Sequence, residues 1–510
     1  MKTPLGFDPQ PPRPLWGIRP PTRKNASMMR PILVAPAPER VVIPIRQCLG
    51  MAAAPLVAPG QQVQTGQPIA AAINDVDGPS GPQVHASISG TVESLEAHAV
   101  PNPVTGEEIC VTIRGDGLDS RFTGYDGLDD PLQMAPERIC ELVAKAGIVG
   151  LGGAMFSTAS KLAAQCEIHT LILNGAECEP YITCDEILLR EHAAEVLRGA
   201  KIMMRALGAT QAVIGVETDM PEARVAVHDA IDADGCDDVH VSVVTAKYPA
   251  GGERQLIQLI MGQEVPEGAL PSDIGFVCHN VGTAAAIADF FRDGRPLISR
   301  IVTITGSGIN EPLNIDTRIG TLMADLFQLA NGRSDDTSHL IMGGPMMGVS
   351  LPSDELPVTK ATNCLILMKP RDISPPRREM PCIRCGECNQ VCPAQLLPQD
   401  LLRAGRQHDI DALKEFGLDA CIECGCCDYV CPSYIPLTAR FVRSKVEVAE
   451  HDAEMAQAVR ARARFEAREA RLTRQRDVRD QDLEAQVVEA HETESIADIM
   501  ARVDARDDQQ

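Results

Sequence analysis

The sequence CIRCGECNQVCP at residues 382–393 and its counterpart CIECGCCDYVCP at residues 421–432 decide how the C-terminal part of this chain folds. Both read C-x2-C-x2-C-x3-C-P, the spacing by which thiolates hold a [4Fe–4S] cluster, and in two-cluster proteins the fourth cysteine binds the other cluster. The sequence therefore predicts two clusters. The expected ligands are Cys382, Cys385, Cys388 and Cys431 for one cluster, and Cys421, Cys424, Cys427 and Cys392 for the other.

Zinc is the alternative partner for these cysteines. A zinc site prefers two cysteine pairs separated by a longer loop, and a fourth thiolate this close would crowd its tetrahedral shell. Cys426 would break the two-residue gap if it replaced Cys427, so we expect it to be a neighbour and not a ligand. Pro393 and Pro432 end the two loops, and the helical pattern between them completes a bacterial ferredoxin-like domain over residues 375–440.

Composition limits what the rest of the chain can be. At 510 residues and 54.8 kDa it should form several domains, and its net charge of -23 argues against nucleic acid, which needs a basic surface. No run of about 18 apolar residues suggests a membrane span, and the first residues lack the apolar core of a signal peptide. We therefore expect a cytosolic chain that meets a membrane only through partner subunits, with cysteines outside the two motifs buried as ordinary residues.

The N-terminal region contains two different patterns. Residues 1–40 are rich in proline and arginine without periodicity, which predicts an extended leader lying over another domain. Residues 41–115 alternate short apolar runs with turn sequences, which predicts a small β domain. The stretch resembles the barrel-sandwich of biotinyl and lipoyl carriers, but the carrier lysine is missing because no lysine occurs between Lys24 and Lys145.

The central region predicts an α/β domain and a second sheet. Residues 130–295 alternate amphipathic helices with buried runs such as HTLILN and QAVIGV, which is typical of a parallel sheet covered by helices. Residues 298–369 predict strand, turn, strand, helix and strand, a β-grasp pattern. The tail over residues 441–510 has acid–base neighbours at helical spacing but few apolar positions, which favours a solvated or frayed helix, or a disordered tail, over a docking segment.

GLGGAMFSTASK at residues 150–161 is a candidate phosphate-binding loop. It is not a dinucleotide fingerprint, because Met155 stands where the third glycine would be and a helix precedes it, and it lacks the Gly-Lys-Ser/Thr of a P-loop. Ser157 and Thr158 can cap a following helix whose N–H groups would accept a phosphate, and Lys161 can neutralise it. This arrangement suits a mononucleotide such as FMN.

Several motifs in order carry a family resemblance. GLGGAMFSTASK, NGAECEPYITCDE, YPAGGERQLI and HNVGTAAAI are similar to the flavin- and NADH-binding subunit of respiratory complex I. Together with the barrel-sandwich segment, GGPMMG and the two cysteine motifs, the chain resembles the RnfC family of Rnf electron-transport complexes. The resemblance implies FMN contacts by Gly150, Gly152, Gly153, Lys161, Asn174, Asn280 and Thr283, and an NAD(H) side lined by Glu177, Glu179, Tyr248 and Glu253.

The resemblance also implies a fold and an activity. The fold class would be multidomain α/β and α+β: a barrel-sandwich-like module, a Rossmann-like flavin and nucleotide domain, an SLBB-like β-grasp domain, a double [4Fe–4S] domain and a helical tail. The activity would be that of a peripheral NAD(H)-oxidoreductase subunit, at the cytoplasmic face of a bacterial inner membrane. Electrons would pass between NAD(H) and ferredoxin through FMN and two clusters, coupled with the other Rnf subunits to ion translocation. No side chain is expected to act as a catalytic acid or base.

Two other functions remain open from the sequence. One is a diaphorase subunit of a soluble hydrogenase or formate dehydrogenase, and the other is a flavin-free relay that reduces a redox-sensing regulator. Relatives usually read GGAGFPT where this chain has GGAMFST, so Met155 and Ser157 replace glycine and proline. Whether the Met155 side chain crowds a flavin is a question for the structure.

Overall fold

A computed structural model describes residues 14–73, 81–102, 106–375 and 377–507 of the chain. Two compact units are present, the first within residues 1–402 and 420–438, the second within residues 403–419 and 439–510. Residues 1–13 of the predicted leader and 508–510 of the predicted tail lie outside the described residues.

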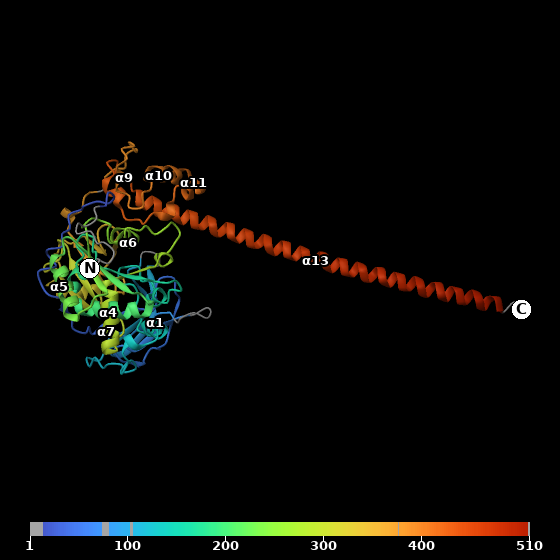
Figure 1. Ribbon diagram of the computed structural model, residues 1–510, viewed down its shortest axis with the longest axis horizontal. Helices are drawn as coiled ribbons and strands as arrows, with labels where there is room; N and C mark the ends of the chain where they lie inside the picture. Colours follow the sequence, from blue (N-terminus) through green and yellow to red (C-terminus); the bar gives the residue numbers. More distant parts are fainter. Residues whose placement is uncertain (1–13, 74–80, 103–105, 376, 508–510) are drawn as a thin grey trace. The chain divides into compact units, whose positions relative to one another are not determined.

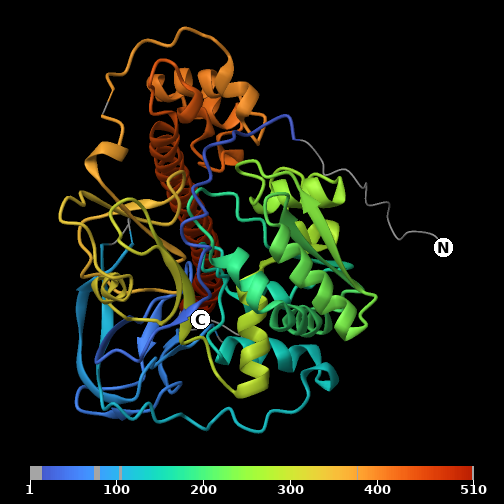
Figure 2. The same cartoon turned by 90° about the vertical axis from the view of Figure 1, so that its left-hand side faces the viewer.

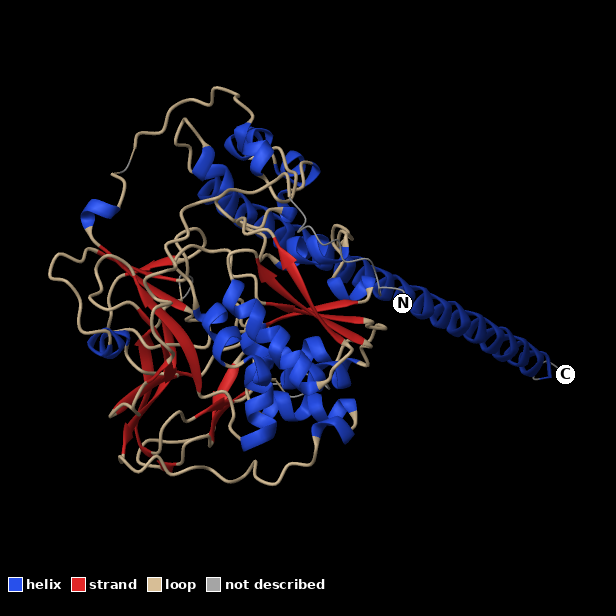
Figure 3. Ribbon diagram, turned by 60° about the vertical axis from the view of Figure 1, so that its left-hand side comes forward, coloured by secondary structure: helices blue, strands red, loops and turns tan. Residues whose placement is uncertain are grey.

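The α/β part of the first unit contains the predicted parallel sheet, with strand order β11-β10-β9-β12. Helices cover this sheet (Figures 1 and 3) because their apolar sides need burial; α1, for example, buries Ile139, Leu142 and Val143 as expected. The elements are η1 (Pro131–Gln133), α1 (Pro136–Lys145), α2 (Thr158–Leu162), β9 (Thr170–Asn174), α3 (Cys184–Glu191), α4 (Ala193–Leu207), β10 (Gln211–Glu217), α5 (Pro221–Asp234), β11 (Val239–Val244), α6 (Glu253–Met261), η2 (Pro271–Ile274), β12 (Phe276–Asn280) and α7 (Val281–Asp293).

Strand order reverses next to β9. From β9 the chain adds β10 and then β11 on one side, whereas β12 returns to pair with the other side of β9. Asn174 and Asn280 are register partners at the carboxyl ends of β9 and β12. In open parallel sheets, ligands bind in the crevice that such a reversal leaves beyond the carboxyl ends of the strands. The topology therefore points to this edge as the site.

The predicted N-terminal β domain consists of two small antiparallel sheets, drawn in blue in Figure 2. They enclose a shared apolar core that includes Val41, Ile43, Ile69, Val111 and Ile113. This two-sheet arrangement agrees with a barrel-sandwich. One sheet has the order β2-β8-β7-β4 and the other β3-β5-β6, with β2 (Arg40–Pro44), β3 (Ala53–Pro55), β4 (Gln62–Val63), β5 (Pro68–Ala72), β6 (Val84–His85), β7 (Gly90–Ala99) and β8 (Glu107–Gly115).

A six-stranded mixed sheet follows the α/β part and has the order β1-β14-β13-β17-β15-β16. Its edge strand β1 (Leu33–Val34) comes from the leader and pairs in parallel with β14. Ile18 also bridges Tyr248, so the described part of the leader contacts both this sheet and the α/β part. The remaining elements are β13 (Ser299–Thr305), β14 (Leu313–Arg318), α8 (Met323–Leu329), β15 (His339–Met342), β16 (Val349–Leu351), β17 (Cys364–Met368) and η3 (Pro370–Asp372).

The two cysteine motifs fold as a structural repeat. Helices α9 (Glu387–Val391) and α12 (Cys426–Val430) occupy equivalent places in the two motifs and pack against each other. Arg384 and Glu423, which lie between the first two cysteines of each motif, both have positive φ, 56° and 57°. The backbone turn of the first loop is thus reproduced in the second, as the sequence repeat predicts.

The second unit is helical. Helices α10 (Pro398–Gln407) and α11 (Ile410–Glu415) pack against the first turns of α13 (Leu437–Asp507), where His408 pairs with Glu447 and Lys414 with Asp452. Beyond these turns α13 continues as one helix (Figure 1), and its residues 449–489 are all exposed. The described part of the tail is therefore a helix, and residues 449–489 of it are exposed to solvent. Within the described residues, no helix is both long and apolar enough to span a membrane.

Gly199 in α4 lets that helix approach α7 closely. A Cβ at Gly199 would clash with the backbone of Ala284. Glycine inside a helix costs about 1 kcal/mol relative to alanine, so its presence in α4 has a packing reason. We expect Gly199→Ala to destabilise the α/β domain by about 1–3 kcal/mol despite its better helix propensity. Calorimetry should show the melting temperature of that domain fall by roughly 3–8 °C.

The control is Val225→Ala on the exposed side of α5, where the side chain packs little and the melting temperature should barely change. An unchanged or higher melting temperature in Gly199→Ala would contradict close α4–α7 packing.

Candidate functional site

A cavity of about 530 Å³ opens at the carboxyl ends of β9 and β12, where the strand order reverses. Its volume falls in the range of small-molecule and cofactor sites. Nine of the eleven predicted FMN and NAD(H) residues line it: Gly150, Gly152, Lys161, Asn174, Glu177, Glu179, Tyr248, Glu253 and Asn280.

The glycine loop forms one wall of the cavity and is fixed at both ends. Val149 bridges Ser157, and the Gly150 N–H donates to the Phe156 carbonyl over 2.8 Å. Ser157 caps α2, since its hydroxyl oxygen accepts the Ser160 N–H over 3.2 Å, as the sequence predicts. Gly153 lies in the loop with φ +108°, outside the cavity wall.

Thr283 supports the loop from behind. Its hydroxyl accepts the Leu151 N–H over 3.1 Å, and the residue is fully buried in α7 instead of lining the cavity. The family resemblance implied that Thr283 contacts FMN; in the structure Thr283 contacts the glycine loop and does not line the cavity.

Met155 does not stand in the cavity wall. Its side chain packs against the core of the α/β domain, while its neighbours Ala154 and Phe156 line the cavity. The backbone of Met155 has φ +47°, a conformation that glycine adopts without strain. Glycine would suit this backbone, and the Met155 side chain leaves the cavity open because it packs against the core.

Lys161 and Glu253 form an ion pair at the mouth of the cavity. Lys161 Nζ lies 2.6 Å from Glu253 Oε1 and also donates to the Cys278 carbonyl over 3.0 Å. Both side chains are partly exposed. An ammonium has three N–H donors, so Lys161 keeps one for an anionic group in the cavity.

The two asparagines at the strand ends shape the floor. Asn174 Nδ2 donates to the Gly251 carbonyl over 2.8 Å, which joins the end of β9 to the loop before α6. Asn280 Oδ1 accepts the Gly282 N–H over 2.8 Å and so caps α7, and its Nδ2 donates to Asp185 Oδ2 over 2.6 Å. Sequence analysis did not single out Asp185, although it lies inside the NGAECEPYITCDE motif.

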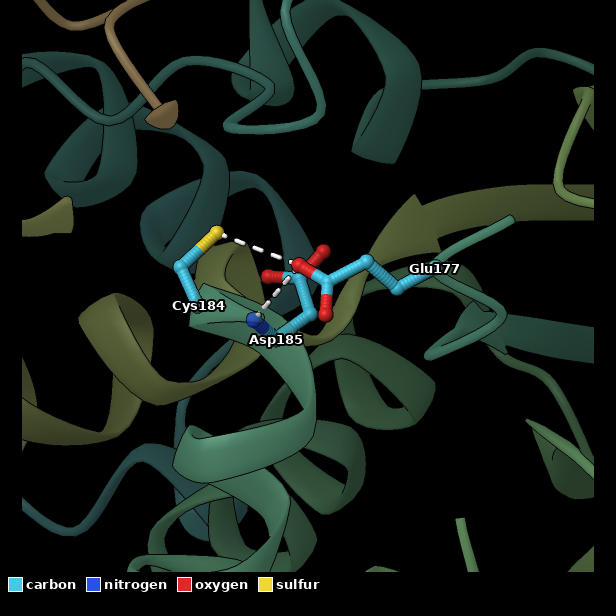
Figure 4. Close-up of side chains that lie close together, drawn as sticks. All are labelled: Glu177, Cys184 and Asp185. Atoms are coloured by element: carbon cyan, nitrogen blue, oxygen red, sulfur yellow. Dashed lines mark hydrogen bonds between the residues drawn. The ribbon is translucent and has the colours of Figure 1, made fainter. Parts of the chain in front are cut away.

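Glu177 lines the cavity but turns its carboxylate toward the start of α3 (Figure 4). Its oxygens accept the N–H groups of Asp185 over 3.0 Å and Glu186 over 3.3 Å, and the Cys184 thiol lies 3.4 Å away. Glu177, Cys184 and Asp185 each bring one ligand-type atom within 4.8 Å of the others. Because the Glu177 oxygens already accept these donors, the group acts as a buried helix cap.

Glu179 joins the cavity to the GGPMMG segment of the six-stranded sheet. Its carboxylate accepts the N–H groups of Met346 over 3.2 Å and Met347 over 2.9 Å. A Cβ at Gly344 would clash with this carboxylate, so the glycine permits the contact. Burial raises the pKa of Glu179 to about 7, although the two N–H groups oppose that shift.

Tyr248 connects the cavity to the second cysteine loop. The ring is buried and lines the cavity, and the hydroxyl donates to the Cys424 carbonyl over 2.8 Å. Ile422, between the first two cysteines of that loop, also lines the cavity. The second cluster motif therefore forms part of the cavity wall.

The two cysteine loops lie beside each other. The predicted ligand sets require this, because each cluster takes its fourth cysteine from the other motif. The Met380 N–H donates to the Ser433 carbonyl and the Ser433 hydroxyl to the Pro381 carbonyl, each over 2.9 Å, which places the start of the first motif beside the end of the second. Burial raises the pKa of the Cys392 thiol, and the nearby Cys424 sulfur adds to the shift.

Within the described residues, no three sulfurs of the cysteine motifs lie within 4.8 Å of one another. Cys426 is fully buried in the apolar layer that contains Tyr248, Ile18 and the predicted ligand Cys424, so its exclusion from the ligands stays a prediction.

The cavity also has a buried ring nitrogen, His279 Nε2, without a hydrogen-bond partner among the described residues. Burial lowers the pKa of His279 far below its usual value, so the ring is neutral and can donate or accept one bond. A bound group with ring nitrogens, hydroxyls and a phosphate fits this donor and acceptor set.

Family models match four regions of the chain. They are described as a Nuo51 FMN-binding domain over residues 143–289, an RnfC barrel sandwich hybrid domain over residues 15–118, an SLBB domain over residues 301–350 and a 4Fe-4S dicluster domain over residues 376–455. An RnfC-type subunit of an ion-translocating oxidoreductase complex from Yersinia pestis bv. Antiqua is 42% identical over 465 residues, covering 91% of this chain and 74% of the relative. The chain belongs to the RnfC family.

The equivalent subunit from Pseudomonas aeruginosa is 43% identical over 467 residues, and the match covers 91% of this chain but only 59% of that relative. Among solved structures, an NAD+-reducing [NiFe]-hydrogenase chain in the H2-reduced state is 17% identical with a TM-score of 0.44, covering 65% of this chain and 63% of that chain.

These matches confirm several predictions. The fold class is confirmed module by module, and FMN and [4Fe–4S] clusters are confirmed as the cofactors of the matched domains. The two relatives are named as subunits of ion-translocating oxidoreductase complexes, which agrees with the predicted enzyme class. The roles of single residues stay predictions.

The Met155 geometry predicts that FMN affinity does not depend on this side chain. In the reconstituted chain, Met155→Gly should change the FMN dissociation constant by less than about threefold, because the side chain lies outside the cavity wall. Gly152→Ala is the matched variant: its Cβ would lie 3.6 Å from Asn280 Cβ on the cavity wall, and binding should weaken at least tenfold. Flavin fluorescence quenching measures both, and a tenfold gain in Met155→Gly would show that the methionine crowds the ligand.

Buried carboxyls predict a pH-dependent stability for the ligand-free chain. Burial raises the pKa of Glu179 to about 7 and that of Glu217 to about 8, above their unfolded values. The folded state therefore holds extra protons, and this stabilisation is present at acidic pH and lost as pH rises through 7–8. Glu179→Gln should reduce the loss between pH 5 and 7 by about 2–3 kcal/mol, or roughly 5 °C in melting temperature.

The exposed variant Glu137→Gln in α1 is the control and should follow the parent curve. If Glu179→Gln also followed the parent curve, Glu179 would be ionised throughout this pH range.

Proposed function

We propose that the chain exchanges electrons between NAD(H) and two [4Fe–4S] clusters through FMN held in the 530 Å³ cavity. A flavin supplies the step between two-electron hydride chemistry and one-electron transfer. The observation that carries the proposal is the shared wall: Ile422 of the second cluster motif lines the cavity that the glycine loop also lines.

The residues of the cavity have separate tasks. The backbone of Gly150 and Gly152 allows close approach of a phosphate, and Lys161 neutralises its charge while paired with Glu253. Asn174 and Asn280 set the floor. Glu179 and the Tyr248 ring lie where a nicotinamide ribose and ring would be bound, although both also hold neighbouring segments in place.

The proposed clusters have a defined order. Cys421, Cys424, Cys427 and Cys392 hold the cluster next to the cavity, because Tyr248 and Ile422 join their loop to it. Cys382, Cys385, Cys388 and Cys431 hold the outer cluster, since Cys382 and Cys385 are exposed. Electrons from NADH thus enter the inner cluster first, and the outer cluster exchanges them with a partner protein.

Family membership suggests which protein exchanges electrons with the outer cluster. We propose that the outer cluster meets another iron–sulfur or membrane subunit of an Rnf complex, and that ferredoxin exchanges electrons with the complex only indirectly. The chain would lie at the cytoplasmic face of the inner membrane, held there by partner subunits, and its electron transfer would be coupled to ion translocation. The relatives belong to ion-translocating oxidoreductase complexes, which supports this assignment.

Two cysteine variants test the order of the clusters. The chain is reconstituted anaerobically with iron, sulfide and FMN and titrated with NADH while flavin and iron–sulfur absorbance are followed. Cys385→Ser, in the outer set, should leave flavin bleaching and reduction of the remaining cluster intact. Cys424→Ser, in the inner set, should still allow flavin bleaching but slow reduction of the outer cluster at least 100-fold, because the inner step is missing.

Iron content of about four per chain and an unchanged circular dichroism spectrum verify that each variant is folded with one cluster. The reverse result, with Cys385→Ser blocking the remaining cluster, would contradict the order. If about eight irons assemble but FMN does not bind, the chain is a flavin-free relay and the proposed function is wrong.

A further inference from the structure

A second cavity lies behind the floor of the first. It has a volume of about 470 Å³, and Asp185 and Asn280 line both cavities. The hydrogen bond from Asn280 Nδ2 to Asp185 Oδ2, 2.6 Å long, therefore stands in the partition between them. The two cavities share no other lining residues among those described.

The second cavity is lined by apolar residues and by a group of charged side chains. Arg292 pairs with Asp289, Asp293 and Glu195, and Arg295 pairs with Asp289, all partly exposed. Such a lining favours water, which the first cavity would largely lose once a cofactor filled it. The partition thus separates a cofactor cavity from a polar cavity.

Asp185 differs from the other acids around the first cavity. Glu177 uses both oxygens as a helix cap, Glu179 accepts two backbone N–H groups and Glu253 pairs with Lys161. The Asp185 carboxylate accepts a side-chain hydrogen bond on one oxygen, Oδ2, and the donor is Asn280. The other oxygen is available for a proton.

Charged and titratable groups face Asp185 from every neighbouring element. They are Glu177 from the loop after β9, Cys184 in the same turn of α3, Arg300 from β13 and Lys24 from the leader. Arg300 donates to the carbonyls of Leu151 and Lys360, so it approaches Asp185 without pairing with it directly. Burial and the Glu177 charge raise the pKa of Asp185 to about 7, against the opposing effects of Asn280, Arg300 and Lys24.

We propose that Asp185 is the group that carries protons between the cofactor cavity and the polar second cavity. The inference rests on the proposed function, because it requires hydride chemistry in the first cavity. A hydride is one proton and two electrons. When NADH delivers it and both electrons leave through the clusters, one proton per hydride remains beside the cofactor and must be accepted by a base.

The step balances in atoms and electrons. The Asp185 carboxylate forms an O–H bond while the N–H or O–H bond that held the proton in the cofactor cavity breaks. Only the proton moves to Asp185, because both electrons have left through the clusters. The O–H bond then breaks toward water in the second cavity, which returns Asp185 to its charged form. For electron flow toward NAD+, the same side chain supplies the proton in the opposite direction. A pKa close to the operating pH suits both directions.

Asp185→Asn tests the proposal in the full chain reconstituted with both clusters and FMN. The flavin midpoint potential is measured from pH 5.5 to 9 in the parent and in Asp185→Asn, because the reduced flavin itself ionises near neutral pH in both. The difference between the two curves should change with pH near 7, where burial and the Glu177 charge place the pKa of Asp185. After anaerobic mixing with NADH, proton release is followed with a pH indicator and compared with flavin bleaching in the same sample; in Asp185→Asn the ratio of the proton-release rate to the bleaching rate should fall at least tenfold.

Asp229→Asn, an exposed charge change on α5, is the matched control, and Asp185→Glu should restore proton release at least in part. If Asp185→Asn binds FMN and keeps the parent's potential curve and ratio of proton release to bleaching, Asp185 is only a structural neighbour of Asn280. If neither parent nor variant binds FMN, the proposed function has failed and not the assignment of Asp185 alone.

Discussion

The hydrogen bond from the Tyr248 hydroxyl to the Cys424 carbonyl is the interaction on which the proposed electron path depends. It joins residues 176 positions apart and fixes a cysteine loop against the wall of a nucleotide-sized cavity. Ile18, Met346 and Cys426 surround the contact with apolar atoms, which exclude water from it. A rigid, dry contact of this kind keeps the inner cluster at a fixed distance from any ligand in the cavity.

The cavity is assembled from segments that are far apart in the chain. The parallel sheet provides the floor, the glycine loop one side, the leader reaches Tyr248 from outside, and GGPMMG of the six-stranded sheet binds Glu179. Buried acids concentrate here, and Lys24 and Arg300 supply the nearby positive charges. Buried carboxyls without full pairing become protonated more easily, which makes this edge sensitive to pH and suited to proton exchange.

The sequence predicted those features that depend on local spacing. The cysteine loops, the parallel strands, the N-cap at Ser157 and the helical tail follow from short-range patterns, and the structure agrees with them. Contacts between distant segments were out of reach. Thr283 supports the loop instead of lining the cavity, and Asp185 and His279 line it although no pattern marked them, because neither their burial nor their neighbours can be read from one sequence. Whether the Met155 side chain crowds a flavin likewise could not be predicted, because the answer depends on the direction in which that side chain points.

Locating the two clusters and the flavin directly would test the central claim. Anomalous X-ray scattering at the iron edge, from crystals of the anaerobically reconstituted chain with FMN, would place all the iron in the structure. The account predicts flavin density in the cavity lined by Gly152 and Ile422, with the nearer iron cluster bound by Cys421, Cys424, Cys427 and Cys392. Flavin density elsewhere, or the cluster bound by Cys382 and Cys385 lying nearer to it, would contradict the account.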